Sequence, residues 1–370
     1  MNTPDKKLRY APTLKTAPWL VLGFSFLFLL VQAIFQNGAS DAHPFELFLY
    51  PLIVLVNLLP LLLLIAVFFF LTRRLWVGVL LTALPFVAAL YTNYYKVLYR
   101  KEPFNPADFV LAGEAGDMLE RYALTPDVWV VLGILLALLM IVGAFFFRPA
   151  KIGLKTRIIG VLLCVVLAFL AHPLYQDKTY YDRLDAPGES FNPVSASAGK
   201  GFLFTFLTDI STVHYQQPEG YSVEAAKEIL ARYETAETLD PSTTPNVIAI
   251  MSEAFFDPTE AENLKFLPGR DPLVNYRKIL SQSYYGKIVV PGFAGGTAAT
   301  ESEFLTGINT ALVSTAMPTV YTSYIKRKTY GLPMLFSQSG SEIDGIHPGH
   351  PWFYNRQNVY PCLGFESFMT

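Results

Sequence analysis

The sequence predicts a multi-pass α-helical membrane domain followed by an α/β domain. Three observations predict this architecture. The 370 residues are 52% hydrophobic and 16% charged, with a mean hydropathy of +0.35, which is more apolar than a water-soluble fold of this size can easily hide. Five long apolar stretches lie in the first half of the chain. In the second half, short apolar runs alternate with helical patterns, as in a parallel sheet with crossover helices.

Five apolar stretches are long enough to cross a bilayer, because a helix needs about 20 apolar residues to span roughly 30 Å of hydrocarbon. The predicted transmembrane helices cover residues 18–35, 47–71, 75–91, 128–147 and 158–174. Asn57 is the strongly polar residue inside the second, and tryptophan and tyrosine residues lie at several ends, where they favour the headgroup zone. A cleavable signal peptide is the alternative for the first span, but no small-residue cleavage pattern follows Phe35.

The placement of lysine and arginine predicts the direction of these helices. Basic residues gather before the first span, between the second and third, and between the fourth and fifth, whereas residues 36–46 contain none. Residues 96–127 contain four basic residues against six acidic ones. Because cytoplasmic loops carry the basic excess, residues 1–17 are expected in the cytoplasm, and an odd number of spans places the chain after Leu174 outside the cell membrane.

Two connecting regions lie outside the predicted spans and the α/β domain. Residues 96–127 form either an ordinary loop or one that contains a short interfacial helix. Residues 176–244 follow the transmembrane domain of residues 18–175 and are expected to form an extracytoplasmic linker region that packs on another part of the protein. Within this region, Ser222 is expected to cap a helix that runs to about Thr238.

Residues 245–370 show the alternating strand and helix pattern of a largely parallel α/β domain. The predicted strands are residues 246–251, 287–290 and 342–346. The predicted helices are residues 271–281, 297–305 and 333–339, the last of which ends at Gly340.

Three chemically different side chains follow the predicted strands. Glu253 follows the first strand, Thr297 follows the second after a glycine-rich turn, and His347 follows the third. Ligands of open α/β sheets bind beyond the carboxyl ends of the strands. A carboxylate, a hydroxyl and an imidazole at one edge suit a metal-assisted attack on a phosphorus or sulfur ester.

A threonine hydroxyl is a poor nucleophile at neutral pH, so Thr297 would need a divalent cation or a neighbouring base. Glu253 would be a hard anionic ligand for that cation, and attack by Thr297 on phosphorus would give a phospho-threonine steadied by helix N–H groups. Each residue also has a structural alternative. Glu253 could be an acid at a helix N-terminus, Thr297 an N-cap, and His347 a structural or solvated histidine.

These motifs together resemble the lipoteichoic acid synthase family, which are membrane phosphoglycerol transferases of the sulfatase and alkaline phosphatase superfamily. The matching segments are residues 246–253, Gly295 to Glu301, His347, Phe353 to Arg356, Tyr360 and Leu363 to Phe365. The resemblance implies a sulfatase-like α/β domain in which Glu253 is a metal ligand and Thr297 is both ligand and nucleophile. It also implies that His347 and Arg356 contact the substrate.

The same resemblance implies a divalent metal, Mn²⁺ first, with Mg²⁺ or Zn²⁺ as alternatives. It implies phosphatidylglycerol as donor and a polyglycerophosphate chain or a glycan as acceptor. A lipid donor suits this architecture, because an anchored domain meets a headgroup in the bilayer plane at high effective concentration.

The sequence departs from the family at the downstream metal ligands. The family completes its site with an adjacent Asp and His, but no Asp–His dipeptide follows Glu253 here. Glu253 and Thr297 alone leave a divalent ion with too few protein ligands. We therefore expect this chain to hold only the N-terminal half of a catalytic domain and to be inactive by itself.

Other functions stay open or are disfavoured. The alternatives are a sulfatase, a phosphoethanolamine-type transferase, or a non-catalytic membrane-anchored remnant. A transporter is disfavoured because the spans lack ionisable residues at mid-membrane depth. A net charge of −2 and the lack of a basic stripe disfavour nucleic acid. Cys164 and Cys362 predict no disulfide framework, and the sequence predicts no oligomeric state.

Overall fold

The computed structural model describes residues 10–39, 43–100, 102–109, 125–188, 192–212, 220–232, 245–252, 255–291, 297–310, 320–351 and 353–370. The chain separates into two compact units, with the main boundary between Pro218 and Glu219. We call them the membrane unit and the C-terminal unit and describe each by itself. The predicted linker region of residues 176–244 is divided between them.

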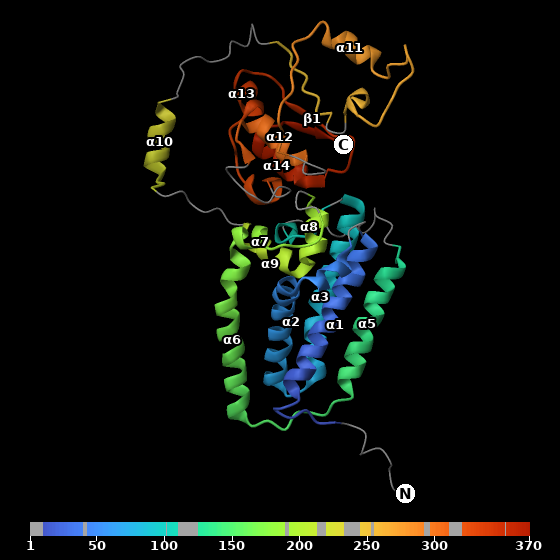
Figure 1. Cartoon of the computed structure of the whole chain (residues 1–370). Helices are drawn as coiled ribbons and strands as arrows, with labels where there is room; N and C mark the ends of the chain where they lie inside the picture. Colours follow the sequence, from blue (N-terminus) through green and yellow to red (C-terminus); the bar gives the residue numbers. More distant parts are fainter. Residues whose placement is uncertain are drawn as a thin grey trace. The chain divides into compact units, whose positions relative to one another are not determined.

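The membrane unit contains five helices that are long and apolar enough to cross a bilayer, as the sequence predicts (Figure 1). They are α1 (Ala17–Ala39), α2 (Pro51–Thr72), α3 (Leu75–Arg100), α5 (Val128–Phe145) and α6 (Leu154–Gln176). A 3-10 helix, η2 (Pro44–Leu49), precedes α2. Arg73 has a left-handed conformation with φ of 63°, which ends α2 and lets the chain reverse into α3.

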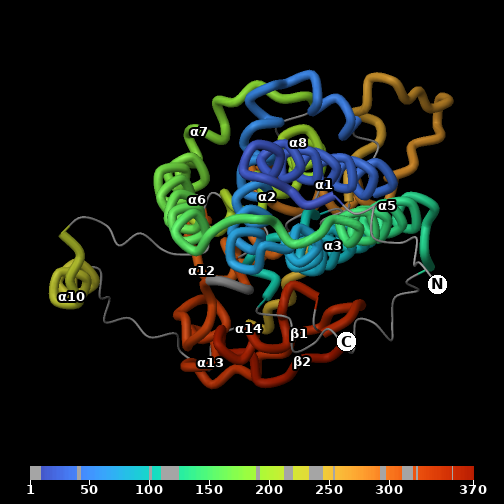
Figure 2. Tube along the Cα trace, turned by 90° about the horizontal axis from the view of Figure 1, so that it is seen from below, coloured from blue at the N-terminus to red at the C-terminus, as the bar shows by residue number. Residues whose placement is uncertain are grey.

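Helices α1, α2, α3 and α5 pack together, and α6 lies against α2 (Figure 2). Large side chains at their contacts are fully buried, among them Phe28, Phe35 and Phe69. Most of α6 is exposed, with only 17% of its apolar window buried in the protein. An exposed apolar helix surface is stable in hydrocarbon, because lipid tails are as apolar as the side chains themselves.

Three short helices from the predicted linker region belong to the membrane unit. They are α7 (Lys178–Arg183), α8 (Pro193–Lys200) and α9 (Phe202–Thr212). The chain turns between α8 and α9 at Gly201, which has φ of 86°, a conformation that strongly favours glycine. Helices α7 and α9 pack against α6, and α9 also packs against α2.

Asn57 binds both sides of this turn. Its amide nitrogen donates to the backbone oxygen of Lys200 at 2.8 Å, and its amide oxygen accepts from the N–H of Phe204 at 3.1 Å. The side-chain oxygen of Gln32 accepts from the N–H of Leu203 at 3.1 Å. Amide side chains of α1 and α2 thus satisfy the backbone groups that the ends of α8 and α9 leave without helical partners.

Residues 102–109 fold back on the end of α3. The ammonium of Lys96 lies 2.7 Å from the Asp108 carboxylate and donates to the backbone oxygen of Pro103 at 3.0 Å. The N–H of Phe104 donates to Asn93 at 2.9 Å. Residues 106–109 form one 3-10 turn, and the remainder of the predicted interfacial segment, residues 110–124, lies outside the described residues.

The C-terminal unit contains short helices and, among the described residues, one two-stranded parallel sheet. Strand β1 (Asp344–Ile346) pairs with β2 (Ser367–Met369), with Gly345 opposite Phe368. The helices are α10 (Val223–Ala231), η4 (Pro258–Glu260), α11 (Val274–Leu280), α12 (Thr297–Thr306), α13 (Leu332–Gln338), η8 (Phe353–Asn355) and α14 (Arg356–Leu363). The π-helix η7 (Val320–Tyr324) is assigned to the membrane unit.

Several predicted elements of this unit are confirmed. The third predicted strand contains β1, and the predicted helices at 271–281, 297–305 and 333–339 correspond to α11, α12 and α13. Ser222 caps α10 by accepting from the N–H of Ala225 at 3.0 Å. Helix α10 ends at Ala231, earlier than the predicted end, and residues 233–244 lie outside the described residues.

Two predicted strands are wrong. Residues 246–251 and 287–290 form no ladder, and their apolar side chains are exposed, with Ile248 at 85% and Val289 at 101% of full exposure. A strand requires a neighbour for its backbone N–H and C=O groups, and no described segment pairs with these two. An apolar run indicates that a strand is favourable but does not supply its partner.

Candidate functional site

Thr297 is the first residue of α12 and is partly buried. The glycine-rich turn before it, residues 292–296, lies outside the described residues. The first-turn N–H groups of an α-helix have no intrahelical acceptor, and the helix dipole is positive at that end. A hydroxyl at this position therefore lies beside backbone donors that suit the oxygens of a phosphate or sulfate ester.

Glu301, one turn further along α12, forms a buried ion pair with Arg356 on α14. The guanidinium binds the carboxylate through Nη2 at 2.7 Å and through Nε at 3.1 and 3.2 Å. The hydroxyl of Tyr360 donates to the same carboxylate at 2.8 Å. The side chains of Arg356 and Glu301 are only 3% and 11% exposed, so water screens this pair weakly.

The backbone around α14 directs Arg356 toward this carboxylate. Tyr354 and Asn355 both have left-handed conformations, with φ of 55° and 64°, which are uncommon outside glycine. The Arg356 guanidinium also donates to the backbone oxygen of Phe353 at 3.2 Å. A cation at a helix N-terminus is opposed by the helix dipole, and the Glu301 carboxylate offsets that repulsion.

His347 directly follows β1, and its backbone N–H donates to Met369 at the end of β2, at 2.9 Å. Its Nδ1 accepts from the N–H of Gly349 at 3.2 Å. Burial lowers the pKa of His347, and the positive charge of Arg356 lowers it further, while Glu301 opposes these effects. A lowered pKa favours the neutral ring, and because Nδ1 accepts from Gly349, the proton of the neutral ring would lie on Nε2, which can donate to a ligand oxygen.

The structure places three of the four predicted site residues among its described residues. Thr297 and Arg356 lie on helices joined by the ion pair of Glu301, and His347 lies within electrostatic range of that pair. Glu253 lies outside the described residues. Arg356 is bound to a protein carboxylate, so its predicted contact with substrate stays a prediction.

Sequence reasoning did not identify Glu301 as a functional residue. The residue lies four positions after Thr297, a spacing that places both on one face of a helix. The sequence shows that spacing, but it does not indicate the partner of Glu301, because Arg356 on α14 is 55 residues away in the chain.

A metal site is not formed by the described residues. They contain no group of three or more histidine, cysteine, aspartate or glutamate side chains placed to hold an ion. Thr297 contributes one oxygen, which is too few for a divalent cation.

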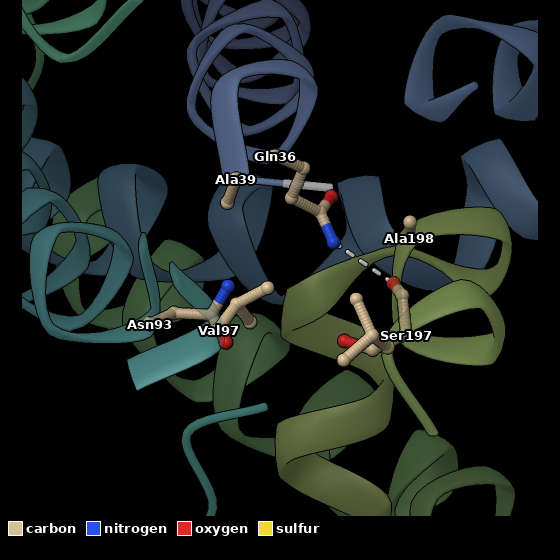
Figure 3. Close-up of a pocket in the computed structure, with 7 residues that line it drawn as sticks. Gln36, Ala39, Asn93, Val97, Ser197 and Ala198 are labelled. Atoms are coloured by element: carbon tan, nitrogen blue, oxygen red, sulfur yellow. Dashed lines mark hydrogen bonds between the residues drawn. The ribbon is translucent and has the colours of Figure 1, made fainter. Parts of the chain in front are cut away.

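A small pocket lies in the membrane unit, between α1, α3 and α8 (Figure 3). Gln36, Asn93 and Ser197 line it, and Gln36 Nε2 donates to the backbone oxygen of Ser197 at 2.9 Å. Its enclosed free space suits about one water molecule. The pocket therefore has no room for a larger ligand.

Comparison with known proteins defines the class of the C-terminal unit. Residues 245–370 match the model of the Sulfatase family. Five helices long and apolar enough to cross a membrane thus precede a segment that matches the Sulfatase family, and enzymes of that family generally use a divalent metal. These comparisons do not confirm the narrower resemblance to lipoteichoic acid synthases.

A particular relative has a similar sequence over most of the chain. A protein of Rhizobium meliloti (strain 1021), whose name refers to cyclic beta-1,2-glucan modification, is 28% identical over 296 residues. The similarity covers 77% of this chain and 45% of the relative, so the chain spans less than half of that protein's length. No solved structure matches the chain.

Proposed function

We propose that this protein transfers a phosphoglycerol group from phosphatidylglycerol to an acceptor outside the cell membrane, through a covalent intermediate on Thr297. The observation that carries the proposal is a sulfatase-family domain in a chain with five membrane helices. Ester chemistry beside a bilayer is suited to a substrate whose headgroup stays in the bilayer plane. The N-terminus is proposed to lie in the cytoplasm and the C-terminal unit outside.

The proposed reaction has two balanced steps. The Thr297 oxygen attacks the phosphorus of phosphatidylglycerol, the bond from phosphorus to the diacylglycerol oxygen breaks, and diacylglycerol leaves with a proton. A hydroxyl of the acceptor then attacks the phospho-threonine, which restores the Thr297 hydroxyl and gives a phosphoglycerol ester.

The described residues suit parts of this reaction. N–H groups of the first turn of α12 would bind the non-bridging oxygens, whose charge grows in the transition state. The neutral ring of His347 would offer a further donor from Nε2. A divalent ion, Mn²⁺ first, with Glu253 and Thr297 among its ligands, is part of the proposal, and further ligands would be required.

A glycan is the proposed acceptor ahead of a polyglycerophosphate chain. The name of the Rhizobium meliloti relative refers to a cyclic glucan, and a glucan presents many hydroxyl groups able to attack a phospho-threonine. A polyglycerophosphate chain presents hydroxyl groups of the same chemical kind, so both are tested as acceptors.

The experiment uses membranes that contain the full-length protein encoded by the gene, with phosphatidylglycerol labelled on an acyl chain by a fluorophore. We expect Mn²⁺-dependent release of fluorescent diacylglycerol, increased by added cyclic glucan, and a phosphorylated Thr297 detectable by mass spectrometry. Thr297→Ala should reduce release to the level of empty membranes. Thr306→Ala, at the other end of α12, is the matched control and should retain release.

Parallel incubations separate the alternatives. Hydrolysis of an aryl sulfate without diacylglycerol release would support a sulfatase, which the family match also favours. Release from labelled phosphatidylethanolamine alone would support a phosphoethanolamine-type transferase. No product and no phospho-threonine under any condition would reject the transfer and support a non-catalytic protein.

A further inference from the structure

The carboxylate of Glu301 connects two helices of the C-terminal unit. It lies on α12 and binds two side chains of α14, the guanidinium of Arg356 at 2.7 Å and the hydroxyl of Tyr360 at 2.8 Å. A guanidinium that binds a carboxylate through two nitrogens fixes the plane of the pair as well as its distance. Two partners on a second helix therefore restrict both the position and the rotation of α12 at Glu301.

This restriction extends to Thr297. Residues four apart in an α-helix lie on the same face, about one turn from each other. Thr297 begins α12, so its direction depends on the rotation of the helix about its axis. A helix held by apolar contacts alone can rotate about its axis by small amounts at little cost. A helix that is also held by a bidentate ion pair cannot.

The residues next to the ion pair of Glu301 and Arg356 support the same conclusion. The charges of Glu301 and Arg356 both affect the pKa of His347, and the His347 ring stacks on Phe353, with ring centroids 6.4 Å apart. Phe353 in turn accepts a hydrogen bond from Arg356 through its backbone oxygen. The pair thus links the helix that carries the proposed nucleophile to the segment that carries His347.

We propose that Glu301 is a positioning residue, which directs the Thr297 hydroxyl by holding α12 to Arg356 and Tyr360 on α14. The inference rests on the proposed function, in which Thr297 is the nucleophile. It also assigns Arg356 a role through Glu301 in place of direct contact with the lipid donor.

The first arm of the test measures turnover. Glu301→Gln, Arg356→Gln and the double variant are compared for kcat and KM with fluorescent phosphatidylglycerol, with Glu303→Gln as control. Glu303 is also a carboxylate of α12, but it binds Thr310 at 2.7 Å. We expect each single variant to lower kcat at least tenfold with KM within twofold, and the double variant to be no slower than the slower single variant.

The second arm probes the placement of the side chain at position 297 and does not depend on turnover. Thr297→Cys is reacted with a neutral maleimide, and the labelled cysteine is identified by mass spectrometry. Adding Glu301→Gln should change the labelling rate of Cys at position 297 at least threefold, whereas adding Glu303→Gln should not. Arg356→Lys keeps the charge but loses the bidentate geometry, so it should resemble Arg356→Gln and not the parent protein.

The outcomes are separable. A higher KM with unchanged kcat in Arg356→Gln, together with normal turnover in Glu301→Gln, would overturn the inference and return Arg356 to direct substrate binding. An unchanged labelling rate in Glu301→Gln would overturn it whatever reaction the protein catalyses. If the parent protein releases no diacylglycerol, the proposed function fails, and the labelling arm still decides the role of Glu301.

Discussion

Replacing Asn57 by leucine tests whether one buried amide holds α8 and α9 on the membrane helices. The side chain of Asn57 is fully buried. It bonds the backbone oxygen of Lys200 at 2.8 Å and the backbone N–H of Phe204 at 3.1 Å. Leucine is close in size, so the main effect of Asn57→Leu is to remove these partners and not to leave a cavity.

The expected cost follows from the two backbone groups. A buried donor or acceptor that loses its partner costs about 1–3 kcal/mol, so two groups give about 2–6 kcal/mol. Side-chain hydrogen bonds between membrane helices average about 0.6 kcal/mol each, so the loss of two bonds gives a lower bound of about 1.2 kcal/mol. We therefore expect a loss of about 1–6 kcal/mol in the free energy of unfolding.

The assay is unfolding of the purified protein in mixed micelles with increasing SDS, followed by circular dichroism. Thr82→Val is the matched control, because Thr82 is fully buried and its hydroxyl has no hydrogen-bond partner among the described residues. That substitution should leave stability unchanged or slightly higher. If Asn57→Leu and Thr82→Val unfold at the same SDS fraction, the amide does not hold the turn and the reasoning fails.

Three further predictions concern other parts of the chain. Burial lowers the pKa of His347 in the folded state, so the unfolded state binds the proton more readily. Stability should therefore fall as pH drops below about 6.5. His347→Gln should flatten that part of the stability profile, measured by thermal unfolding at a series of pH values. Glu253→Ala should lower bound Mn²⁺, measured by elemental analysis, and an unchanged metal content would contradict its predicted role as a ligand. Gly201→Ala should destabilise the protein about as much as Asn57→Leu, because the new Cβ would clash with the Asn57 amide oxygen and φ is 86°. Unfolding identical to that of the parent protein would show that the turn adapts.

The membrane helices were predictable because the signal is local. Length and apolarity of each segment decide whether it can cross a bilayer, and all five predicted spans correspond to helices. Their ends were less predictable. Helix α3 continues from the predicted end at Tyr91 to Arg100, where Asn93 and Lys96 find partners in residues 103–108 that no local pattern indicates.

The candidate site was predictable only in part. Thr297 begins a helix as expected, and His347 follows a strand as expected. The strand predicted before Glu253 is wrong, so the argument that placed Glu253 at the edge of a sheet has no support in the described residues. The ion pair of Glu301 and Arg356 was missed, because periodicity does not identify a partner 55 residues away.

The sequence by itself determined that the chain has five membrane helices, that a chemically different domain follows them, and that Thr297 lies at a helix start. Each of these depends on residues close together in the chain. Only the tertiary structure decided that Asn57 binds the turn between α8 and α9, and that Glu301 binds α14. Hydrophobic length and helix capping are properties of one segment, whereas a buried hydrogen bond or ion pair requires two segments whose pairing the fold alone establishes.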